Sequence, residues 1–412
     1  MASLKYIERD LEAEIGKYVE SREIIAVVGP RQCGKTTMIN KMLDEEETKG
    51  KVVERVSFDD QKILGVFERD VDSFIDLHVR GKDMLFIDEI HYSKESGRRL
   101  KYIYDTCWTK IIISGSSAPE MSIYSLKYLV GRILTFTLHT FSFREFLRCR
   151  EPSMLGVFER GDYKGDITAR LNRHLEEYIL FGGFPRVALA EGKDEKRKLL
   201  DGIVNTYLLR EIREILDISE DYKLLDLLKS LSLQTGNIIN YNELSALTGY
   251  SYAGLKRYLN ILEKTFICSL LRPFFSNKRT ELVKNPKVYF LDAGFRNACI
   301  GNFSTERTDK GSMYENFVFS ELARMGERVK FWNTKSAAEV DFVAEKEGKA
   351  VPIEVKSRLG ARKITKSYGS FISKYSPERG YFLSLDSEGR EKIKGCTVIF
   401  LPFVKFSSLG KI

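Results

Sequence analysis

The sequence predicts an α/β protein of several domains, and three observations support this prediction. An apolar run at residues 24–28 leads into a glycine-rich loop, as a buried parallel strand would. Two more apolar runs, at 84–87 and 111–113, end in polar residues and leave room for intervening βα units. The chain has 412 residues, enough for two to four domains that each bury a core.

The composition excludes several classes of protein. Hydrophobic residues make up 43% and charged residues 30% of the chain, as in ordinary globular proteins. The six cysteines are scattered without a C-x-x-C pair, which argues against a zinc site or a disulfide scaffold. No apolar run approaches the roughly 20 residues of a membrane helix, and the charged N-terminus does not resemble a signal peptide. We expect a cytoplasmic protein without membrane association, whose net charge of +8 permits nucleic-acid binding without requiring it.

The first motif is the loop GPRQCGKT, which fits G-x-x-x-x-G-K-[ST] at every position. Its glycines let backbone N–H groups point inward and, with the following helix N-terminus, cradle phosphate oxygens. Lys35 is expected to reach the outer phosphates, and the Thr36 hydroxyl to ligate Mg²⁺. The flanking strand and helix disfavour a chance glycine-rich turn. We predict an ATP site made by Gly29, Pro30, Arg31, Gln32, Cys33, Gly34, Lys35, Thr36 and Thr37.

Two later strands supply the polar groups that such a site needs. DMLFIDEIH ends its apolar run at Asp88, which would hold Mg²⁺ through water, and at Glu89, which would orient the attacking water. TKIIISGSS ends in Ser114 and Ser116, either of which would lie between the first two strands and touch the γ-phosphate or the water. For each serine taken singly, a strand that merely ends in a small-residue turn is nearly as good an interpretation.

Arg132, at the start of the strand in LVGRILTFTLHTFSFREFL, is a candidate arginine finger. It would neutralise charge as the γ-phosphate leaves, in cis or in trans. The alternative is a solvated surface arginine. A finger acting in trans would require a homo-oligomer.

Residues 1 to about 190 resemble a prokaryotic AAA+ ATPase in which the P-loop module is followed by a further C-terminal domain. The motifs that carry the resemblance are GPRQCGKTT, LFIDEIH, IIISGSS, LVGR, FSFREF and FGGFPRV. The resemblance places the serines at the sensor-1 position, and it places a G-x-P turn of the helical lid against the adenine. Gly183 and Pro185 in GGFPRV match that turn, which implies a nucleotide contact for Pro185. A helix-breaking connector is the alternative.

The middle of the chain predicts helices over about 195–235, followed by a helix-turn-helix with a tight turn at Gly249 and a two-stranded wing. In a DNA-binding interpretation, Lys256 and Arg257 lie near phosphates of the major groove. Further phosphate contacts would come from the basic wing residues Lys278, Arg279, Lys284 and Lys287. A lid or protein-interaction module is the alternative. Ser251 and Asp292 are predicted as helix N-caps.

A second motif lies near the C-terminus, in AEVDFVAEKEGKAVPIEVKS, which predicts a hairpin with KEGK as the turn. Alternate residues of a strand share a face, so Glu354 and Lys356 project together, and Asp341 would reach the same edge. Two carboxylates and a lysine can hold a divalent metal that activates water for attack on a phosphodiester. Lys356 would position the water or stabilise the developing charge.

The spacing D-x₁₂-E-x-K resembles the PD-(D/E)xK nuclease core, and the resemblance covers about residue 300 to the end. That family carries another acid on the helix before the hairpin, which implies Glu315 in GSMYENFVFSELARMG. The resemblance implies Glu315, Asp341 and Glu354 as ligands of Mg²⁺ or Mn²⁺. Many active members carry a further acidic residue near the hairpin, where this chain has Val351 and Pro352, so DNA cleavage and mere retention of the fold both stay open.

These expectations combine into four domains: a P-loop AAA+ core over 1–150, a helical lid over 151–222, a winged helix-turn-helix over 223–294 and a PD-(D/E)xK-like domain over 295–412. The predicted function is an ATPase that couples nucleotide state to DNA binding and to metal-dependent cleavage. A regulatory ATPase with an inactive nuclease fold that binds a protein partner is the alternative. A small-molecule kinase is disfavoured by the large remainder of the chain.

Overall fold

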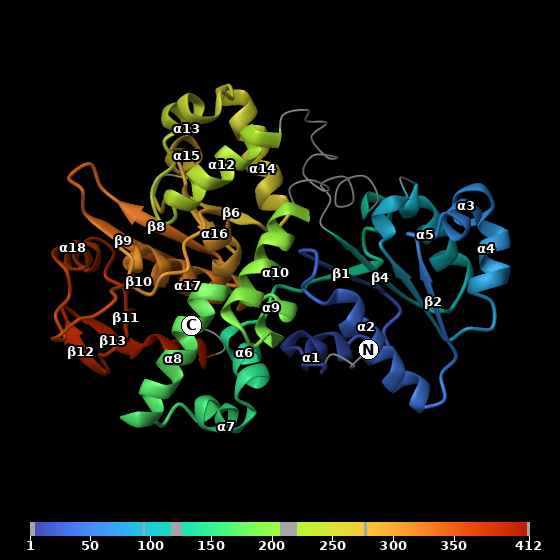
Figure 1. The fold of residues 1–412 in the computed structure, drawn as a ribbon, viewed down its shortest axis with the longest axis horizontal. Helices are drawn as coiled ribbons and strands as arrows, with labels where there is room; N and C mark the ends of the chain where they lie inside the picture. Colours follow the sequence, from blue (N-terminus) through green and yellow to red (C-terminus); the bar gives the residue numbers. More distant parts are fainter. Residues whose placement is uncertain (1–4, 94, 117–125, 207–220, 276–277, 410–412) are drawn as a thin grey trace. The chain divides into compact units, whose positions relative to one another are not determined.

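The computed structural model describes residues 5–93, 95–116, 126–206, 221–275 and 278–409. The chain divides into two compact units (Figure 1). The first comprises Met1–Thr140, Arg210–Asp217 and Asn260–Phe266, and the second comprises Phe141–Leu209, Ile218–Leu259 and Ile267–Ile412. The part of the expected helix beyond Thr206 lies outside the described residues. No helix in the described part is long and apolar enough to cross a membrane.

The first unit contains a five-stranded parallel sheet in the order β2-β3-β4-β1-β5. Because β4 lies between β1 and β3, the carboxyl ends of the strands that carry the three predicted motifs meet at one edge. This order confirms the predicted α/β fold. The strands are β1 (Ile24–Gly29), β2 (Val53–Ser57), β3 (Met84–Asp88), β4 (Lys110–Ser116) and β5 (Ile133–Thr137).

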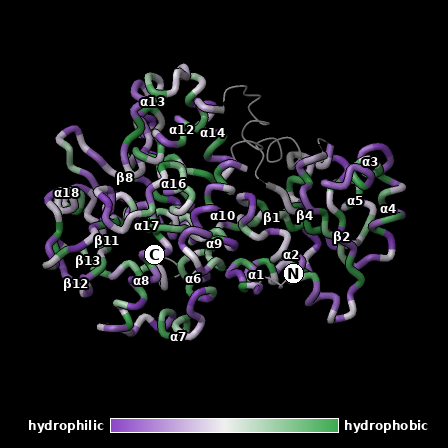
Figure 2. The backbone as a smooth tube through the Cα atoms, in the orientation of Figure 1, coloured by the Kyte–Doolittle hydropathy of each residue, from purple (hydrophilic) through white to green (hydrophobic). Residues whose placement is uncertain are grey.

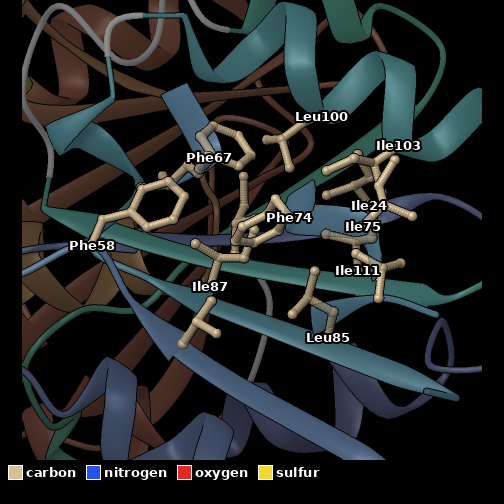
Figure 3. Close-up of a cluster of buried hydrophobic side chains, with 14 of the residues drawn as sticks. Ile24, Phe58, Phe67, Phe74, Ile75, Leu85, Ile87, Leu100, Ile103 and Ile111 are labelled. Carbon is tan, nitrogen blue, oxygen red and sulfur yellow. The ribbon is translucent and has the colours of Figure 1, made fainter. Parts of the chain in front are cut away.

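Helices bury both faces of this sheet. Alternate residues of β1 enter two different cores, with Ile24 and Ala26 in one and Ile25 and Val27 in the other. Strand β1 is accordingly apolar along its length, whereas β2 also contains charged residues; Figure 2 colours the backbone by this hydropathy. Figure 3 shows the first core, where aromatic rings of α3 and α4 pack over the strands. The helical elements are α1 (Asp10–Gly16), α2 (Lys35–Thr48), α3 (Gln61–Arg69), α4 (Val71–His78), η1 (Ile90–Tyr92), α5 (Ser96–Thr106) and η3 (Leu126–Leu129).

The second unit begins with a helical region. Ser142 caps α6 by accepting a hydrogen bond from the Glu145 backbone N–H, while Glu145 accepts one from the Ser142 N–H, so the serine and glutamate form a capping box. The helices of this region are α6 (Phe143–Arg150), α7 (Pro152–Arg160), α8 (Asp166–Phe181), α9 (Pro185–Leu189), α10 (Lys193–Thr206) and α12 (Asp221–Leu233).

The predicted helix pair follows in the middle of the chain. Gly249 has φ +69° and ends the first helix, and Ser251 Oγ accepts a hydrogen bond from the Gly254 N–H at 3.1 Å, which confirms the predicted N-cap. The two strands after the pair are antiparallel, but a helix lies between them where a simple wing turn was expected. The elements are α13 (Tyr241–Thr248), α14 (Tyr252–Lys264), β6 (Cys268–Leu271), α15 (Lys278–Val283), β7 (Lys287–Phe290) and α16 (Ala293–Cys299).

Lys287 corrects the prediction of a basic wing. Its side chain is 3% exposed and forms an ion pair with Glu339, so it cannot contact a phosphate backbone in this arrangement. Lys256 and Arg257 do lie on the surface of α14, as expected. The side chain of Lys278 lies outside the described residues.

A six-stranded mixed sheet forms the C-terminal part, in the order β12-β13-β11-β10-β9-β8. The predicted hairpin is confirmed, because β9 and β10 are antiparallel and a two-residue turn with positive φ at Glu347 and Gly348 joins them. Strand β12 was not predicted. The elements are α17 (Lys310–Arg324), β8 (Val329–Asn333), β9 (Glu339–Lys346), β10 (Lys349–Val355), α18 (Lys366–Tyr375), β11 (Arg379–Ser384), β12 (Gly389–Ile393), β13 (Cys396–Pro402) and α19 (Phe403–Ser407).

Candidate functional site

The glycine-rich loop connects β1 to α2. Gly29 ends β1, and a Cβ atom there would stand 2.0 Å from the backbone oxygen of Leu138, so no side chain fits. Gly34 adopts φ +96° directly before the first residue of α2. The loop therefore has the backbone path that turns amide groups and a helix N-terminus toward one point.

The Lys35 side chain is folded back onto this loop. Its Nζ atom donates hydrogen bonds to the backbone oxygens of Gly29 at 3.0 Å and Pro30 at 2.9 Å, and the residue is only 6% exposed. The carbonyl groups thus hold the ammonium group at the mouth of the loop. A ligand with phosphate oxygens there would offer the same ammonium group charged acceptors, which bind it more strongly than neutral carbonyl groups do.

Asp88 connects all three predicted motifs. Its Oδ2 atom accepts a hydrogen bond from Thr36 Oγ1 at 2.9 Å, and its Oδ1 atom accepts one from Ser114 Oγ. The Glu89 backbone N–H donates to the same Oδ1 at 3.1 Å. A hydroxyl and a carboxylate brought together in this way are oxygen ligands of the kind that Mg²⁺ prefers. Ser116 ends β4 opposite Gly29, but its side chain lies outside the described residues.

Glu89 lies directly after Asp88 in a left-handed conformation, with φ +52°. Such backbone strain in a residue other than glycine is frequent at functional sites. Burial raises the pKa of the Glu89 carboxyl. The His91 hydrogen bond and the charges of Lys35 and Arg31 lower it by more than burial raises it, so the net pKa lies below its usual range. The carboxylate is therefore charged at neutral pH. His91, whose Nδ1 lies 3.1 Å from Glu89 Oε2, was not predicted as part of the site, although the sequence DEIH places it two residues away.

Arg132 lies level with the beginning of β1, at the opposite end of this strand from the loop, which argues against the predicted finger in cis. The strand β5 starts level with the beginning of β1, since Ile133 pairs with Ile24, whereas the loop follows the other end of β1. A six-residue strand spans roughly 17–20 Å. Arg132 instead pairs its Nε with Asp105 Oδ1 at 3.0 Å. A role in trans stays a prediction.

Pro185 belongs to the second unit, where it is the first residue of α9. The turn before it is fixed by Asp292, whose Oδ2 accepts the Gly183 N–H at 2.8 Å. Asp292 also caps α16 through the Phe295 N–H, which confirms its predicted structural role. The nucleotide contact of Pro185 stays a prediction.

The predicted acidic residues of the C-terminal hairpin do come together. The last β9–β10 pair, counted from the hairpin turn, is Phe342 opposite Ile353. One residue further from the turn, the two strands carry Asp341 and Glu354. Asp341 Oδ2 accepts the Val355 N–H at 2.8 Å, and Lys356 Nζ lies 3.0 Å from Glu354 Oε1. The other carboxylate oxygen of Glu354, Oε2, is buried and has no hydrogen-bond partner among the described residues.

Glu315 reaches this cluster from α17, and its Oε2 accepts a hydrogen bond from Tyr289 at 3.3 Å. Burial, followed by the charge of Asp341, raises the pKa of Glu315 and that of Glu354 to about 8 each. Burial likewise raises the pKa of Asp341, against the opposing charges of Lys356 and Lys287. Within the described ranges, no three His, Cys, Asp or Glu residues are placed closely enough to hold a metal as they stand. The predicted three-ligand site is thus not preformed.

Comparisons with known proteins agree with the first of these two sites. Residues 21–147 match the family described as AAA domain, while 172–306 and 310–404 match two domains of unknown function. The matched stretch contains the loop, Asp88 and Ser114, so it is a P-loop ATPase domain of the AAA type. The predicted domain boundaries at 150, 222 and 294 stay predictions.

Similar proteins occur in archaea and bacteria. An uncharacterized protein of Methanocaldococcus jannaschii is 26% identical, with 98% of this chain and 91% of that protein covered. One of Haemophilus influenzae is 26% identical over 81% of this chain and 82% of that protein. Among solved structures, the Walker-type ATPase of Pyrococcus abyssi is 14% identical, covers 71% of this chain and 96% of its own, and has a TM-score of 0.46.

Proposed function

We propose that this protein hydrolyses ATP at the loop of residues 29–37 and that its nucleotide state controls DNA binding and cleavage by the C-terminal domain. The observation that supports the ATPase part best is the convergence of Thr36 and Ser114 on the Asp88 carboxylate. This arrangement gives oxygen ligands for Mg²⁺ beside the phosphate cradle, in a domain of the AAA type.

The residues have separate roles in this proposal. Lys35 would exchange its carbonyl partners for the outer phosphate oxygens, and Thr36 and Asp88 would hold Mg²⁺, Asp88 through water. The bound ion would neutralise charge on the β- and γ-phosphates. Glu89, charged at neutral pH, accepts a hydrogen bond from the attacking water and orients it toward the γ-phosphate.

Phosphate release by purified protein tests this assignment. Glu89→Gln should still bind ATP but should release phosphate at least about a hundredfold more slowly, because the neutral amide accepts the hydrogen bond of the water less strongly than the carboxylate does. The matched control, Glu45→Gln, changes an exposed glutamate of α2 and should leave turnover unchanged. Continued turnover by Glu89→Gln would refute the role of Glu89.

The DNA part of the proposal depends on the second cluster. An unpartnered buried carboxylate oxygen on Glu354 and the raised pKa values of Glu315 and Asp341 favour a site that takes up a cation. Glu315, Asp341 and Glu354 would hold Mg²⁺ or Mn²⁺ after side-chain rotation, since the three are not preformed as a cluster. The ion would supply an activated water, and Lys356 would stabilise charge on the phosphate.

A specific observation also favours the alternative, a nuclease fold that binds a protein partner. Lys356 Nζ already lies 3.0 Å from Glu354 Oε1, so the lysine supplies positive charge where a metal ion would otherwise do so. Plasmid nicking with Mg²⁺ or Mn²⁺ separates the two. Cleavage by the intact protein that is lost in both Glu354→Ala and Lys356→Ala supports the nuclease, whereas no cleavage at any metal concentration supports the protein-binding alternative.

A further inference from the structure

Arg9 is a buried arginine that the sequence motifs do not include. It directly precedes α1 and is 4% exposed. Its Nη1 donates a hydrogen bond to the Cys33 backbone oxygen at 2.8 Å, and its Nη2 donates to the His139 backbone oxygen at 2.7 Å. The Glu12 carboxylate accepts the Arg9 backbone N–H and the Tyr6 hydroxyl, which fixes the backbone from which the guanidinium extends.

The bond to Cys33 determines the direction of one amide in the phosphate loop. Cys33 and Gly34 share a peptide plane, and in a trans peptide the C=O and the N–H point in opposite directions. A guanidinium that holds the Cys33 C=O therefore holds the Gly34 N–H pointing the other way. Gly34 is the residue before the first turn of α2, where such amides bind phosphate.

The second bond connects the loop to the segment in which the chain leaves the first unit. Leu138 donates its N–H to the Val28 oxygen at 2.8 Å, and its own oxygen accepts the Cys33 thiol at 3.3 Å. The first stretch of the first unit ends two residues later, at Thr140. The His139 ring also packs edge-on against Phe266, 6.0 Å between centroids, and Phe266 is the last residue before the chain re-enters the second unit.

We propose that Arg9 is a positioning residue with two effects. It orients the Cys33–Gly34 peptide for phosphate, and it couples ATP binding to the backbone of residues 138–140, where the chain leaves the first unit for the second. This inference rests on the proposed function, because it requires ATP at the loop. A guanidinium suits the task, since its planar fork serves two carbonyl groups at once and stays charged at all relevant pH values.

Two measurements on the full chain test the proposal: the affinity for Mg²⁺-ATP, by calorimetry, and the hydrogen exchange of the peptide over residues 136–141 with and without saturating ATP. In the wild type, ATP should slow exchange in this peptide. Arg9→Met should bind ATP roughly tenfold more weakly, as expected for loss of charged hydrogen bonds, and saturating ATP should no longer slow the exchange. Arg9→Lys, which keeps the charge but not the fork, should be intermediate in both measurements.

Arg80→Met is the matched control, because it removes an exposed arginine of the same unit and should behave as the wild type. If Arg9→Met fails to fold, Arg9→Lys decides by the same two measurements. Wild-type affinity and wild-type exchange in the folded Arg9 variants would overturn the role of Arg9 alone. A wild-type chain that binds no ATP would overturn the proposed function and this inference together.

Discussion

Thr36 Oγ1 and Asp88 Oδ2 form a 2.9 Å hydrogen bond across 52 residues of sequence. The hydroxyl belongs to the first turn of α2, and the carboxylate ends β3, which is not adjacent to β1 in the sheet. Strand β4 separates the two, and its Ser114 donates to the other oxygen of the same carboxylate. The order of the strands thus brings the two hydroxyl groups and the carboxylate together at the carboxyl ends of the sheet strands.

The hydroxyl of Thr36 should matter for hydrolysis. Thr36→Val keeps the shape of the side chain but removes the oxygen that Mg²⁺ needs, so we expect phosphate release to fall by about a hundredfold or more. Thr48→Val is the control, at the far end of the same helix, where the hydroxyl donates to the Glu45 backbone oxygen. Equal turnover of the two variants, measured at saturating ATP and Mg²⁺, would contradict the proposed ligand.

The C-terminal carboxylates should make stability depend on pH. A carboxyl whose pKa is raised by folding stabilises the protein below its unfolded pKa, and this contribution is lost as pH rises through the folded pKa. For Glu354 that window runs from about 4.5 to about 8. Glu354→Gln should therefore gain stability relative to the wild type across this window, on the order of a few kcal/mol, as followed by urea unfolding.

A bound divalent cation should offset the loss of stability that the C-terminal carboxylates cause at high pH. Because carboxylates must lose their protons to bind metal, Mn²⁺ should raise the melting temperature of the wild type more at pH 8.5 than at pH 6. Glu347→Gln, in the exposed turn of the same hairpin, should keep the wild-type response, and Glu354→Gln should lose it. If Mn²⁺ does not change the melting temperature of the wild type at either pH, this result would argue against the metal site.

DNA binding, if it uses α14, should depend on Lys256. Lys256→Glu should weaken binding to duplex DNA and reduce the slope of log affinity against log salt by about one, because one phosphate contact is lost. Fluorescence anisotropy at several salt concentrations measures both quantities. Lys392→Glu carries the same change of charge on an exposed residue of β12 and serves as the control. Equal losses in the two variants would indicate a general effect of net charge.

Local patterns predicted much of this protein because they determine local geometry directly. The spacing of Gly29, Gly34 and Lys35 defines a backbone path, and the structure has that path. The two-residue turn at Glu347 and Gly348 sets the register of the hairpin, so the approach of Asp341 to Glu354 followed from the sequence.

Features that depend on distant partners were not predictable in this way. Arg132 suggested a finger by its place at the start of a strand, but β5 pairs with β1 in a register that puts Arg132 at the end of the strands opposite to the loop. The positive charge of Lys287 suggested an exposed wing, yet its partner Glu339 lies 52 residues later. Arg9 gave no signal, because the Cys33 and His139 groups that accept its hydrogen bonds are backbone oxygens, which any residue can supply.

The most direct test of the central claim is calorimetric titration of the purified chain with ATP in the presence of Mg²⁺. We predict saturable heat with one site per chain for the wild type, and none for Lys35→Ala, which lacks the ammonium group that now rests on the loop carbonyls. Heat of equal size in both proteins, or in neither, would contradict the claim that this loop holds the nucleotide.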